Sequence, residues 1–479
     1  MPFFLNMFGR ANRDAGPVGA QDAGGDGDGL PMPRRLWAIA AISFGSALFV
    51  IDGTVANVAL PTIARDLNVA DGVVTNVVTI YQLVMVMVLL PFSTLADRLG
   101  HRNLYQLGQC VFLAASAMSF FVDSLPGLLI LRAGQALGAG MALSVSAAML
   151  RSIYPERSLG SGLGINSVIV ASSNAIAPTL GGFLVSQLDW RWVFFAAAPL
   201  AVISLIIGHS LPDPVKEHRR FDWIGGLLSA AVLALIIGGV QVATHDRSGF
   251  GFGAIALGAL LAVVWVRRSL GQERPILPVD LLKRPALGLS AMAAVAGFIG
   301  SALLIVALPF KLEQGLGYAP DEVGLLIAPF PLTLLFVAPA AGWLSDRVSP
   351  SVMGCVGMVI AIGGLILIGL IPANAHPFAI AWRLSLCALG FGLFFAPNSR
   401  LLIGSAPKER SAAAGGLLST SRLLGQTLGA SIVGVLLAMN LGLGVAPAFV
   451  AAGFALLAMI GSAYRFRVTG SNLMRKRPA

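Results

Sequence analysis

Charged residues are scarce in this chain. Only 11% of its 479 residues are Asp, Glu, Lys or Arg, whereas 56% are hydrophobic. A soluble globular domain has roughly 25% charged residues, so this scarcity excludes a soluble globule. Apolar runs of roughly 18 to 25 residues, long enough to cross a bilayer as helices, recur from Leu36 onward, and we count fourteen of them. The chain is predicted to be an all-α polytopic membrane protein.

Cysteine and histidine are also rare, and neither has the spacing of metal ligands. The three cysteines, Cys110, Cys355 and Cys387, lie within apolar runs, where cysteine behaves as a small hydrophobe. We therefore expect no metal, no cofactor and no catalytic residue. No GxxxxGK[ST] segment is present, and no loop is long enough for an ATPase domain. A transport function would have to draw on an ion gradient, here taken to be a proton gradient.

The positive charge has a pattern of its own. The net charge is +10, and most Lys and Arg residues fall in alternate loops and in both tails. This is the positive-inside pattern, so both termini are predicted to be cytosolic, in a multi-pass protein of the bacterial inner (plasma) membrane. The same pattern argues against nucleic acid as a partner. Membrane lipid is an expected partner, and the chain is expected to be a monomer.

A repeat divides the chain. GWLSDR (342–347) ends the eighth apolar run as STLADR (93–98) ends the second, with Asp97 and Asp346 249 positions apart. Two bundles of six spans joined by an inserted pair explain that offset. The predicted domains are a polar, Gly-rich cytosolic tail, a first bundle, a linker with two extra spans, a second bundle and a basic tail, at residues 1–35, 36–211, 212–285, 286–467 and 468–479.

One carboxylate lies deep in an apolar run. It is Asp52, within ALFVIDGTVANVALP (47–61), and Arg132 lies at a similar depth in the fourth run. A charged residue at the centre of a bilayer costs about 2.5 to 3.5 kcal/mol on insertion scales and is usually functional. Burial favours the protonated form of Asp52, whereas a nearby Arg favours its ionised form. A conformational change that moves water or Arg132 would therefore change the proton affinity of Asp52. We predict a proton-coupling pair, with a purely structural role as the alternative.

Other polar residues in the spans are less specific. Asn166, Asn174, Pro178 and Gly182 share one face of the fifth run, which indicates either close packing or a cavity wall. Arg383 and Arg422 are also inside predicted spans and need partners, but no acid is near them in sequence. Their roles stay open.

Five segments in order resemble the major facilitator superfamily, and within it the fourteen-span drug:proton antiporter family, over nearly the whole chain. They lie, in chain order, in the first span, in the loop after the second span, in the fourth span, in the fifth span with its outer loop, and at the entry to the extra pair of spans. The segments are IDGTVANVALP (51–61), LADRLGHR (95–102), RAGQALGAG (132–140), SNAIAPTLGG with WRWVF (173–182, 190–194), and FDWIG (221–225). Ser93, Ala136, Ser173 and Ala177 replace glycines usual in these motifs, and Asn76 stands where Trp is common. The resemblance implies two six-helix bundles plus two extra helices.

The resemblance also implies residue roles. Asp97 would pair across the bundle interface and close the cytosolic side, with Arg98 and Arg102 as further gating contacts. Asp346 and Arg347 would be a weaker copy of this gate. Pro178, Gly181 and Gly182 would form the hinge of the antiporter motif. Solvated loop charges and ordinary helix packing are the plainer alternatives for these two groups.

The function predicted is proton-driven export of a hydrophobic small molecule, with cationic compounds among the options, by alternating access. Residues predicted to touch such a substrate are polar or adaptable side chains of the spans: Tyr81, Gln82, Met85, Asn166, Asn174, Phe330 and Phe394. A translocator of lipids or lipid conjugates on the same fold is one alternative. A transport-inactive membrane sensor or an intramembrane enzyme is another, although an enzyme would need a second buried acid, His or Cys in register.

Overall fold

The computed structural model describes residues 29–155, 159–212, 222–245, 249–272, 279–345, 347–372, 374–407 and 411–475. Every long element in these ranges is a helix. In chain order they are α2 (Arg34–Asp66), α3 (Asp71–Val74), α4 (Asn76–Leu99), α5 (His101–Met118), η1 (Ser119–Phe121), α6 (Leu125–Ile153), α7 (Leu159–Gln187), α8 (Arg191–Phe195), α9 (Ala198–Ile207), η3 (Gly208–Ser210), α10 (Trp223–His245), α11 (Gly249–Leu270), α12 (Val279–Leu282), α13 (Pro285–Phe310), η4 (Lys311–Gly315), α14 (Pro320–Ile327), α15 (Pro329–Leu344), α16 (Pro350–Gly369), α17 (Pro377–Gly404), α18 (Ser411–Ala438) and α19 (Ala446–Arg475).

Local sequence explains where these helices begin and end. Proline occupies the first helical position of α13 to α17, where its missing N–H costs no hydrogen bond and its fixed φ suits a helix start. Between α4 and α5 the chain turns at Gly100, which has a φ of 94°. This positive φ favours glycine, and it accounts for the Gly of LADRLGHR. The motif is therefore a sharp helix-to-helix corner.

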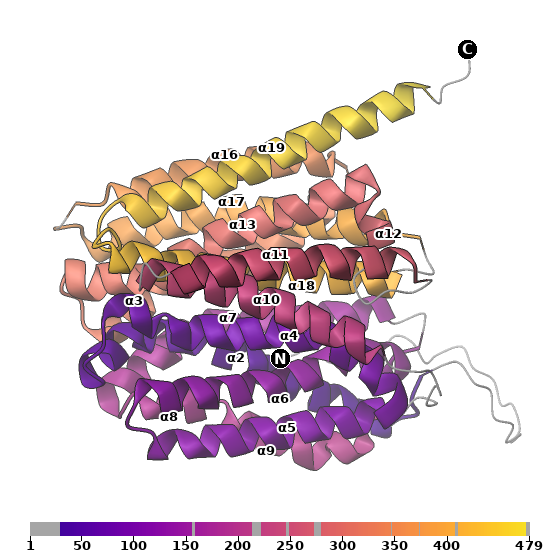
Figure 1. The fold of residues 1–479 in the computed structure, drawn as a ribbon, viewed down its shortest axis with the longest axis horizontal. Coiled ribbons are helices and arrows are strands. Elements are labelled where there is room, and N and C mark those ends of the chain that lie inside the picture. The colour runs from indigo at the N-terminus through magenta and orange to yellow at the C-terminus, as the bar shows by residue number, and fades with distance from the viewer. Residues whose placement is uncertain are drawn as a thin grey trace, which may run out of the picture.

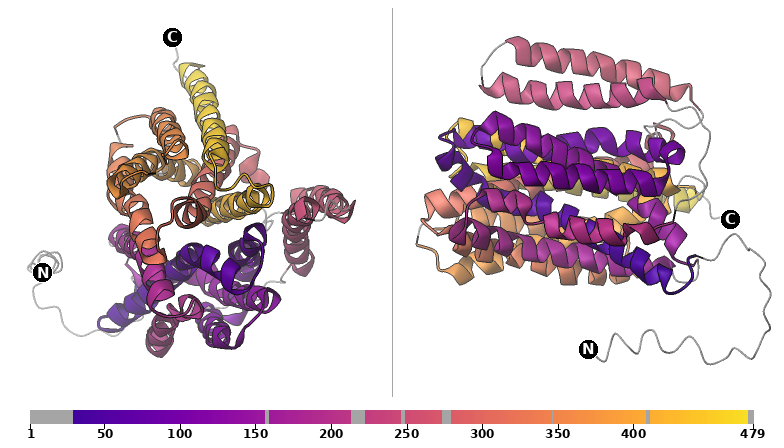
Figure 2. Two further views of the ribbon diagram at one scale, coloured as in Figure 1. Left: turned by 90° about the vertical axis from the view of Figure 1, so that its left-hand side faces the viewer. Right: turned by 90° about the horizontal axis from the view of Figure 1, so that it is seen from below.

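The helices run side by side, with their long axes horizontal in Figure 1. The described residues contain 14 helices or helix pairs long and apolar enough to cross a membrane, as the sequence predicted. Seen along their axes in Figure 2, the first six form one bundle and the last six another, with α10 and α11 standing together at one side. We call the end where α2 begins and α19 finishes the tail end, and the opposite end the far end.

Close packing repeats in the two bundles. A Cβ placed on Gly108 of α5 would lie 2.6 Å from the carbonyl oxygen of Gly138 in α6, so these helices touch backbone to backbone. In the second bundle, a Cβ on Gly357 of α16 would lie 2.6 Å from the carbonyl oxygen of Gly390 in α17. Gly108 and Gly357 are 249 positions apart, the same offset as Asp97 and Asp346. The repeat is thus present in the helix contacts.

The inserted pair is closed at the tail end by Asp222, from FDWIG. Its carboxylate accepts hydrogen bonds from the Gly225 N–H at 3.0 Å, Arg268 Nη2 at 2.9 Å and Gln272 Nε2 at 2.9 Å. Partial burial acts to raise the pKa of Asp222, but these three donors outweigh it and the pKa lies below its usual value. Asp222 both caps α10 and ties it to the end of α11.

One boundary differs from the sequence interpretation. The second bundle was predicted to end at residue 467, but α19 continues to Arg475, and its Arg465 is buried in that bundle. The Arg465 guanidinium is 1% exposed and donates to Ser351 Oγ at 3.1 Å, Ser290 Oγ at 2.8 Å and Asn398 Oδ1 at 2.6 Å. In the structure it ties α13, α16, α17 and α19 together.

Membrane orientation is the first testable prediction. The basic loop KEHRR (216–220), which lies outside the described residues, and both tails are expected to be cytosolic. In a variant lacking Cys110, Cys355 and Cys387, a cysteine introduced by His218→Cys should react with a membrane-impermeant maleimide only after the cells are opened. A cysteine introduced in a loop of the opposite face, by Asn440→Cys, is the matched control and should react in intact cells. Labelling of His218→Cys in intact cells would refute the orientation.

Candidate functional site

The centre of the first bundle holds a buried ion pair. Asp52 of α2 is 0% exposed and Arg132 of α6 is 1% exposed. Arg132 Nη1 donates to Asp52 Oδ2 at 3.0 Å and to Oδ1 at 3.2 Å. The two side chains predicted from their equal depth are therefore in direct contact, on neighbouring helices of one bundle.

Further groups hold the guanidinium in place. Arg132 Nη1 also donates to Gln135 Oε1 at 2.9 Å, and Nε donates to the Val77 carbonyl at 3.3 Å. Gln135 is held in turn, because its Nε2 donates to Ser116 Oγ at 2.8 Å and to the Phe194 carbonyl at 3.0 Å. Sequence reasoning missed Gln135. The available signal was a buried amide three residues after Arg132, on the same helical face.

Aromatic rings enclose the same guanidinium. Arg132 Cζ lies 4.0 Å from the centroid of the Tyr81 ring and 5.2 Å from that of Phe194. Such stacking stabilises a cation where water is excluded. Tyr81 was predicted to contact substrate, and the structure places it, 2% exposed, against the ion pair.

The energetics of this arrangement are finely balanced. Desolvating two charges costs several kcal/mol per ion, and the gain from pairing is of similar size. Removing one partner alone leaves an uncompensated buried charge, at a cost of about 3 to 5 kcal/mol. Proton binding to Asp52 would have the same electrostatic effect on Arg132. The stability of the pair therefore depends on both charges being present.

The two bundles meet tightly at the far end. A Cβ on Gly182 of α7 would collide with the Pro320 carbonyl oxygen and lie 3.2 Å from Gly324 Cα in α14. Gly72 and Gly434 bring α3 and α18 together in the same way, since a Cβ on Gly72 would lie 2.7 Å from the Gly434 carbonyl oxygen. We call these two contacts the far-end seal.

Polar groups reinforce the far-end seal. Arg65, at the end of α2, forms an ion pair with Glu313 of η4. Gln314 Nε2, also from η4, donates to Asp71 Oδ1 of α3 at 3.1 Å. Each of these contacts joins the first bundle to the second. The structure is therefore in a state closed at the far end.

The predicted hinge and gate residues lie at opposite ends of the molecule. Pro178 and Gly182 of α7 belong to the far-end seal, because Gly324 packs on the Pro178 carbonyl, whereas Gly181 packs on the Val55 carbonyl of α2 within the first bundle. Asp97 is in the last turn of α4 at the tail end, and its side chain lies outside the described residues, as does Asp346 altogether.

The cations of the predicted gate differ in exposure. Arg98 is exposed, Arg102 is half-buried at the start of α5, and Arg347 is exposed and stacks on Trp343 with Cζ 4.1 Å from the ring centroid. Their gating role remains a prediction.

The predicted substrate residues are not gathered at one place. Met85 is buried in a hydrophobic cluster built mostly from the first bundle, whereas Phe330 and Phe394 are buried in a larger cluster that includes residues of both bundles. Asn174 is occupied, because its Oδ1 accepts from Thr54 Oγ1 at 2.9 Å. Gln82 and Asn166 are half-buried, and their side-chain oxygens accept no hydrogen bond from the described residues. Both oxygens are enclosed, and the Tyr81 hydroxyl likewise forms no hydrogen bond with the described residues.

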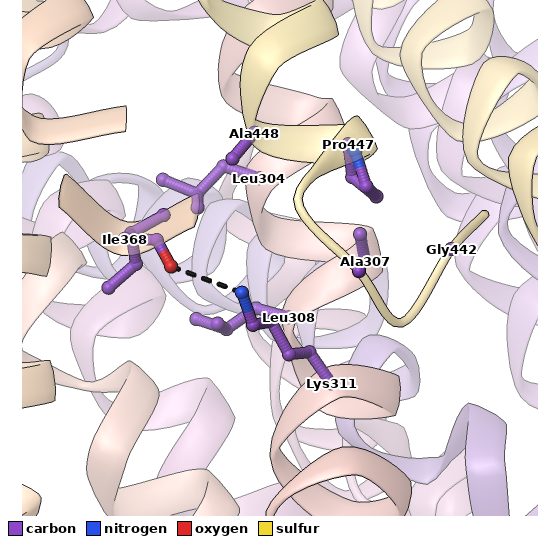
Figure 3. A pocket seen from close by; sticks show the side chains of 9 residues that line it. Leu304, Ala307, Leu308, Lys311, Ile368, Gly442, Pro447 and Ala448 are labelled. Carbon is purple, nitrogen blue, oxygen red and sulfur yellow. Dashed lines mark hydrogen bonds between the residues drawn. The ribbon is translucent and has the colours of Figure 1, made fainter. Parts of the chain in front are cut away.

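A small pocket lies at the far end of the second bundle (Figure 3). Its volume is about 20 Å³, and its lining comes from α13, η4, α16, the α18–α19 turn and the start of α19. Lys311 Nζ donates there to the carbonyls of Ile368 at 3.2 Å and Gly369 at 3.0 Å, which caps the end of α16. Pockets for small molecules are roughly 300 to 1,000 Å³, so this one holds a water at most. It is a helix cap, not a substrate site.

Two repeated six-helix bundles, sealed against each other at one end and holding a buried ion pair, define a membrane transport protein. The chain belongs to the Major Facilitator Superfamily, whose family model matches residues 42–294 and 289–478. It is 40% identical over 414 residues to the uncharacterized transporter YebQ of Escherichia coli, covering 86% of this chain and 91% of that protein.

Other relatives have more specific names. The riboflavin transporter RibZ of Clostridioides difficile is 27% identical over 86% of this chain and 90% of its own. The multidrug resistance protein Stp of Mycobacterium tuberculosis is 29% identical over 85% of this chain and 76% of its own. Among solved structures, a bacterial homologue of the human lysosomal transporter Spinster, in an inward-facing conformation, has a TM-score of 0.66 at 17% identity, covering 91% of this chain and 99% of that one.

Proposed function

We propose that this protein is a proton-coupled exporter of hydrophobic small molecules, a fourteen-span drug:proton antiporter. The observation that carries the proposal is the Asp52–Arg132 pair, a carboxylate and a guanidinium both enclosed in one bundle. A group that must lose or gain a proton as its surroundings change is what coupling requires. Relatives named as multidrug resistance proteins support the export of drugs.

The proposed cycle uses the pair as a switch. A proton arriving at Asp52 neutralises it and frees Arg132, whose remaining contacts are Gln135, Val77 and two rings. The first bundle can then rearrange and the far-end seal can open or close. Substrate binding favours the arrangement of the bundles in which Asp52 and Arg132 are paired and ionised, and the proton leaves on the other side. If the tail end is cytosolic, the far-end seal closes the protein to the outside.

The energy available matches the task. One proton entering across about 100 mV releases roughly 2.3 kcal/mol. Since 1.4 kcal/mol is a factor of ten, this supports about a 50-fold gradient of a neutral compound. No other energy source is needed in the proposal.

Accumulation in inverted membrane vesicles tests this function. Ethidium, riboflavin and a hydrophobic anion, pyrenebutyrate, are supplied outside vesicles energised by respiration. At least one should accumulate only with the protein, and an uncoupler should abolish accumulation. Accumulation that persists with the uncoupler would rule out proton coupling, and passive equilibration of every compound would rule out active export.

The gate gives a second prediction. Asp97 sits at the tail-end terminus of α4, beside the Gly100 corner, where an interface contact would close the cytosolic side. Asp97→Asn should lower the transport rate at least about tenfold, the effect of about 1.4 kcal/mol, and leave the yield of folded protein unchanged. Asp346→Asn, in the repeated motif, is the matched comparison and should have a smaller effect. Wild-type kinetics in Asp97→Asn would refute the gate.

A further inference from the structure

Arg422 lies in the middle of α18 and differs from the other cations of the spans. Arg132 has Asp52, Arg465 has two hydroxyls and an amide, and Arg383 donates to the Ala379 carbonyl at 2.7 Å and stacks on Trp382. Arg422 forms no hydrogen bond or ion pair with any residue that the structure describes, and its Nε is enclosed. A cation without a partner in a span is costly, so a partner from outside the chain is expected.

The packing of α18 shows which way Arg422 faces. One side of the helix packs on α13, because a Cβ on Gly425 would lie 2.7 Å from the Val295 carbonyl oxygen. A second side packs on α3 through Gly434. On a third side, Leu424 and Leu428 join the hydrophobic cluster that includes residues of α10.

Arg422 belongs to the remaining side. Gly415, Ser419, Arg422 and Gln426 follow one another at spacings of four, three and four residues, so they form one face of the helix. All four are partly exposed, whereas Gly425, Gly429 and Gly434 on the packing sides are buried. This polar face lies between the side that packs on α13 and the side that packs on α3, the two elements that α18 joins across the bundle interface. We call it the α18 polar face.

An aromatic surface lies beside the α18 polar face. A Cβ on Gly425 would lie 2.6 Å from Phe298 Cβ of α13, which places Phe298 one helical turn from Arg422. Phe298 stacks on Phe395 of α17, with ring centroids 4.2 Å apart and planes 9° apart, and both rings are partly exposed. A cation next to stacked rings suits a molecule with an aromatic body and an acidic group.

We propose that Arg422 binds the anionic group of the transported compound, so that the substrate is an amphipathic organic anion. This proposal rests on the proposed export function and names its substrate class. A guanidinium binds a carboxylate, sulfonate or phosphate through two parallel hydrogen bonds, and Ser419 and Gln426 are placed to add further donors. An inside-negative membrane potential also favours moving an anion outward.

Three probes on one scaffold test the proposal by binding to the full-length protein in detergent. They are pyrenebutyrate, its neutral amide and pyrenebutylamine, followed by pyrene fluorescence. The wild type should bind pyrenebutyrate at least about tenfold more tightly than the amide, the effect of one charge-assisted hydrogen bond. Arg422→Gln should remove that preference and leave the affinity for the amide unchanged, whereas Arg422→Lys should keep part of it.

The matched control is Arg383→Gln, which removes a span cation that already has partners in the protein and should keep the preference for the anion. Removing the unpartnered charge of Arg422 should not reduce the yield of folded protein. A wild type without preference for the anion, or an Arg422→Gln variant that keeps it, would overturn the proposal. The binding assay needs no proton gradient. If the wild type prefers pyrenebutyrate but shows no uphill transport in vesicles, proton coupling would be refuted and the anion site would stand.

Discussion

Asp52→Asn should abolish uphill, proton-driven export while downhill exchange of substrate continues. The amide keeps the shape of the carboxyl group and an oxygen that can accept from Arg132 Nη1, now 3.0 Å from Asp52 Oδ2. The amide does not bind or release a proton in the pH range in which the protein works, so the proton-coupled step is lost. Uphill accumulation in energised vesicles should fall to the level of vesicles without the protein, and counterflow of preloaded substrate should remain measurable.

A structural Asp52 predicts a different pattern. Loss of its charge strands the buried guanidinium of Arg132, at a cost of about 3 to 5 kcal/mol, so folded protein and both transport modes would fall together. The double variant Asp52→Asn with Arg132→Gln separates the two cases, because it removes the stranded charge. In our account Asp52→Asn and the double variant both keep the wild-type yield, and neither exports uphill; a structural Asp52 predicts that the double variant recovers the yield that Asp52→Asn loses. Recovery of uphill export in the double variant would contradict the coupling role.

Gly182→Val should nearly stop transport by preventing closure of the far end. Any Cβ at this position collides with the Pro320 carbonyl, so α7 and α14 must separate. Overpacking costs about 1 to 3 kcal/mol, which shifts a two-state population by roughly 5- to 150-fold. The contacts within each bundle, such as Gly108 with Gly138 and Gly357 with Gly390, do not involve this position, so the protein should still fold. The measurement is the rate of substrate exchange, together with maleimide labelling of a cysteine introduced by Thr179→Cys, which should become accessible from the far end.

The control for this variant is Gly363→Val. Gly363 is also a helix glycine, in α16, but nothing lies within 4 Å of a Cβ placed there. The same change in helix propensity therefore occurs without a clash across the interface, and transport should stay close to wild type. Equal losses in Gly182→Val and Gly363→Val would show that the far-end seal is not part of the transport cycle.

Much of this architecture could be predicted from sequence because each span is specified locally. Length and hydropathy identify one helix at a time, and the repeated GWLSDR and STLADR segments reveal the two bundles. Depth within a span also placed Asp52 and Arg132 at the same level. Their contact followed because α2 and α6 face each other in the first bundle.

The rest depends on helix rotation and on contacts between distant segments. In the sequence, Gln135 is one polar residue among others in RAGQALGAG. Only the rotation of α6 about its axis, seen in the structure, places its side chain against Arg132. The contact of Gly182 with Gly324 joins residues 142 positions apart, in different bundles, and hydropathy contains no information about it. The burial of Arg465 could not be predicted for a related reason, since only tertiary packing provides the hydroxyls that accept its hydrogen bonds.

Proton release on substrate binding tests the central claim most directly. The detergent-solubilised protein in weakly buffered solution, with a pH-sensitive dye, receives a compound that accumulated in the vesicle assay. Our account predicts that the wild type releases protons in proportion to occupancy, and that Asp52→Asn binds the compound without releasing them. Undiminished release in Asp52→Asn, or binding to the wild type without any release, would contradict Asp52 as the carrier of the coupled proton.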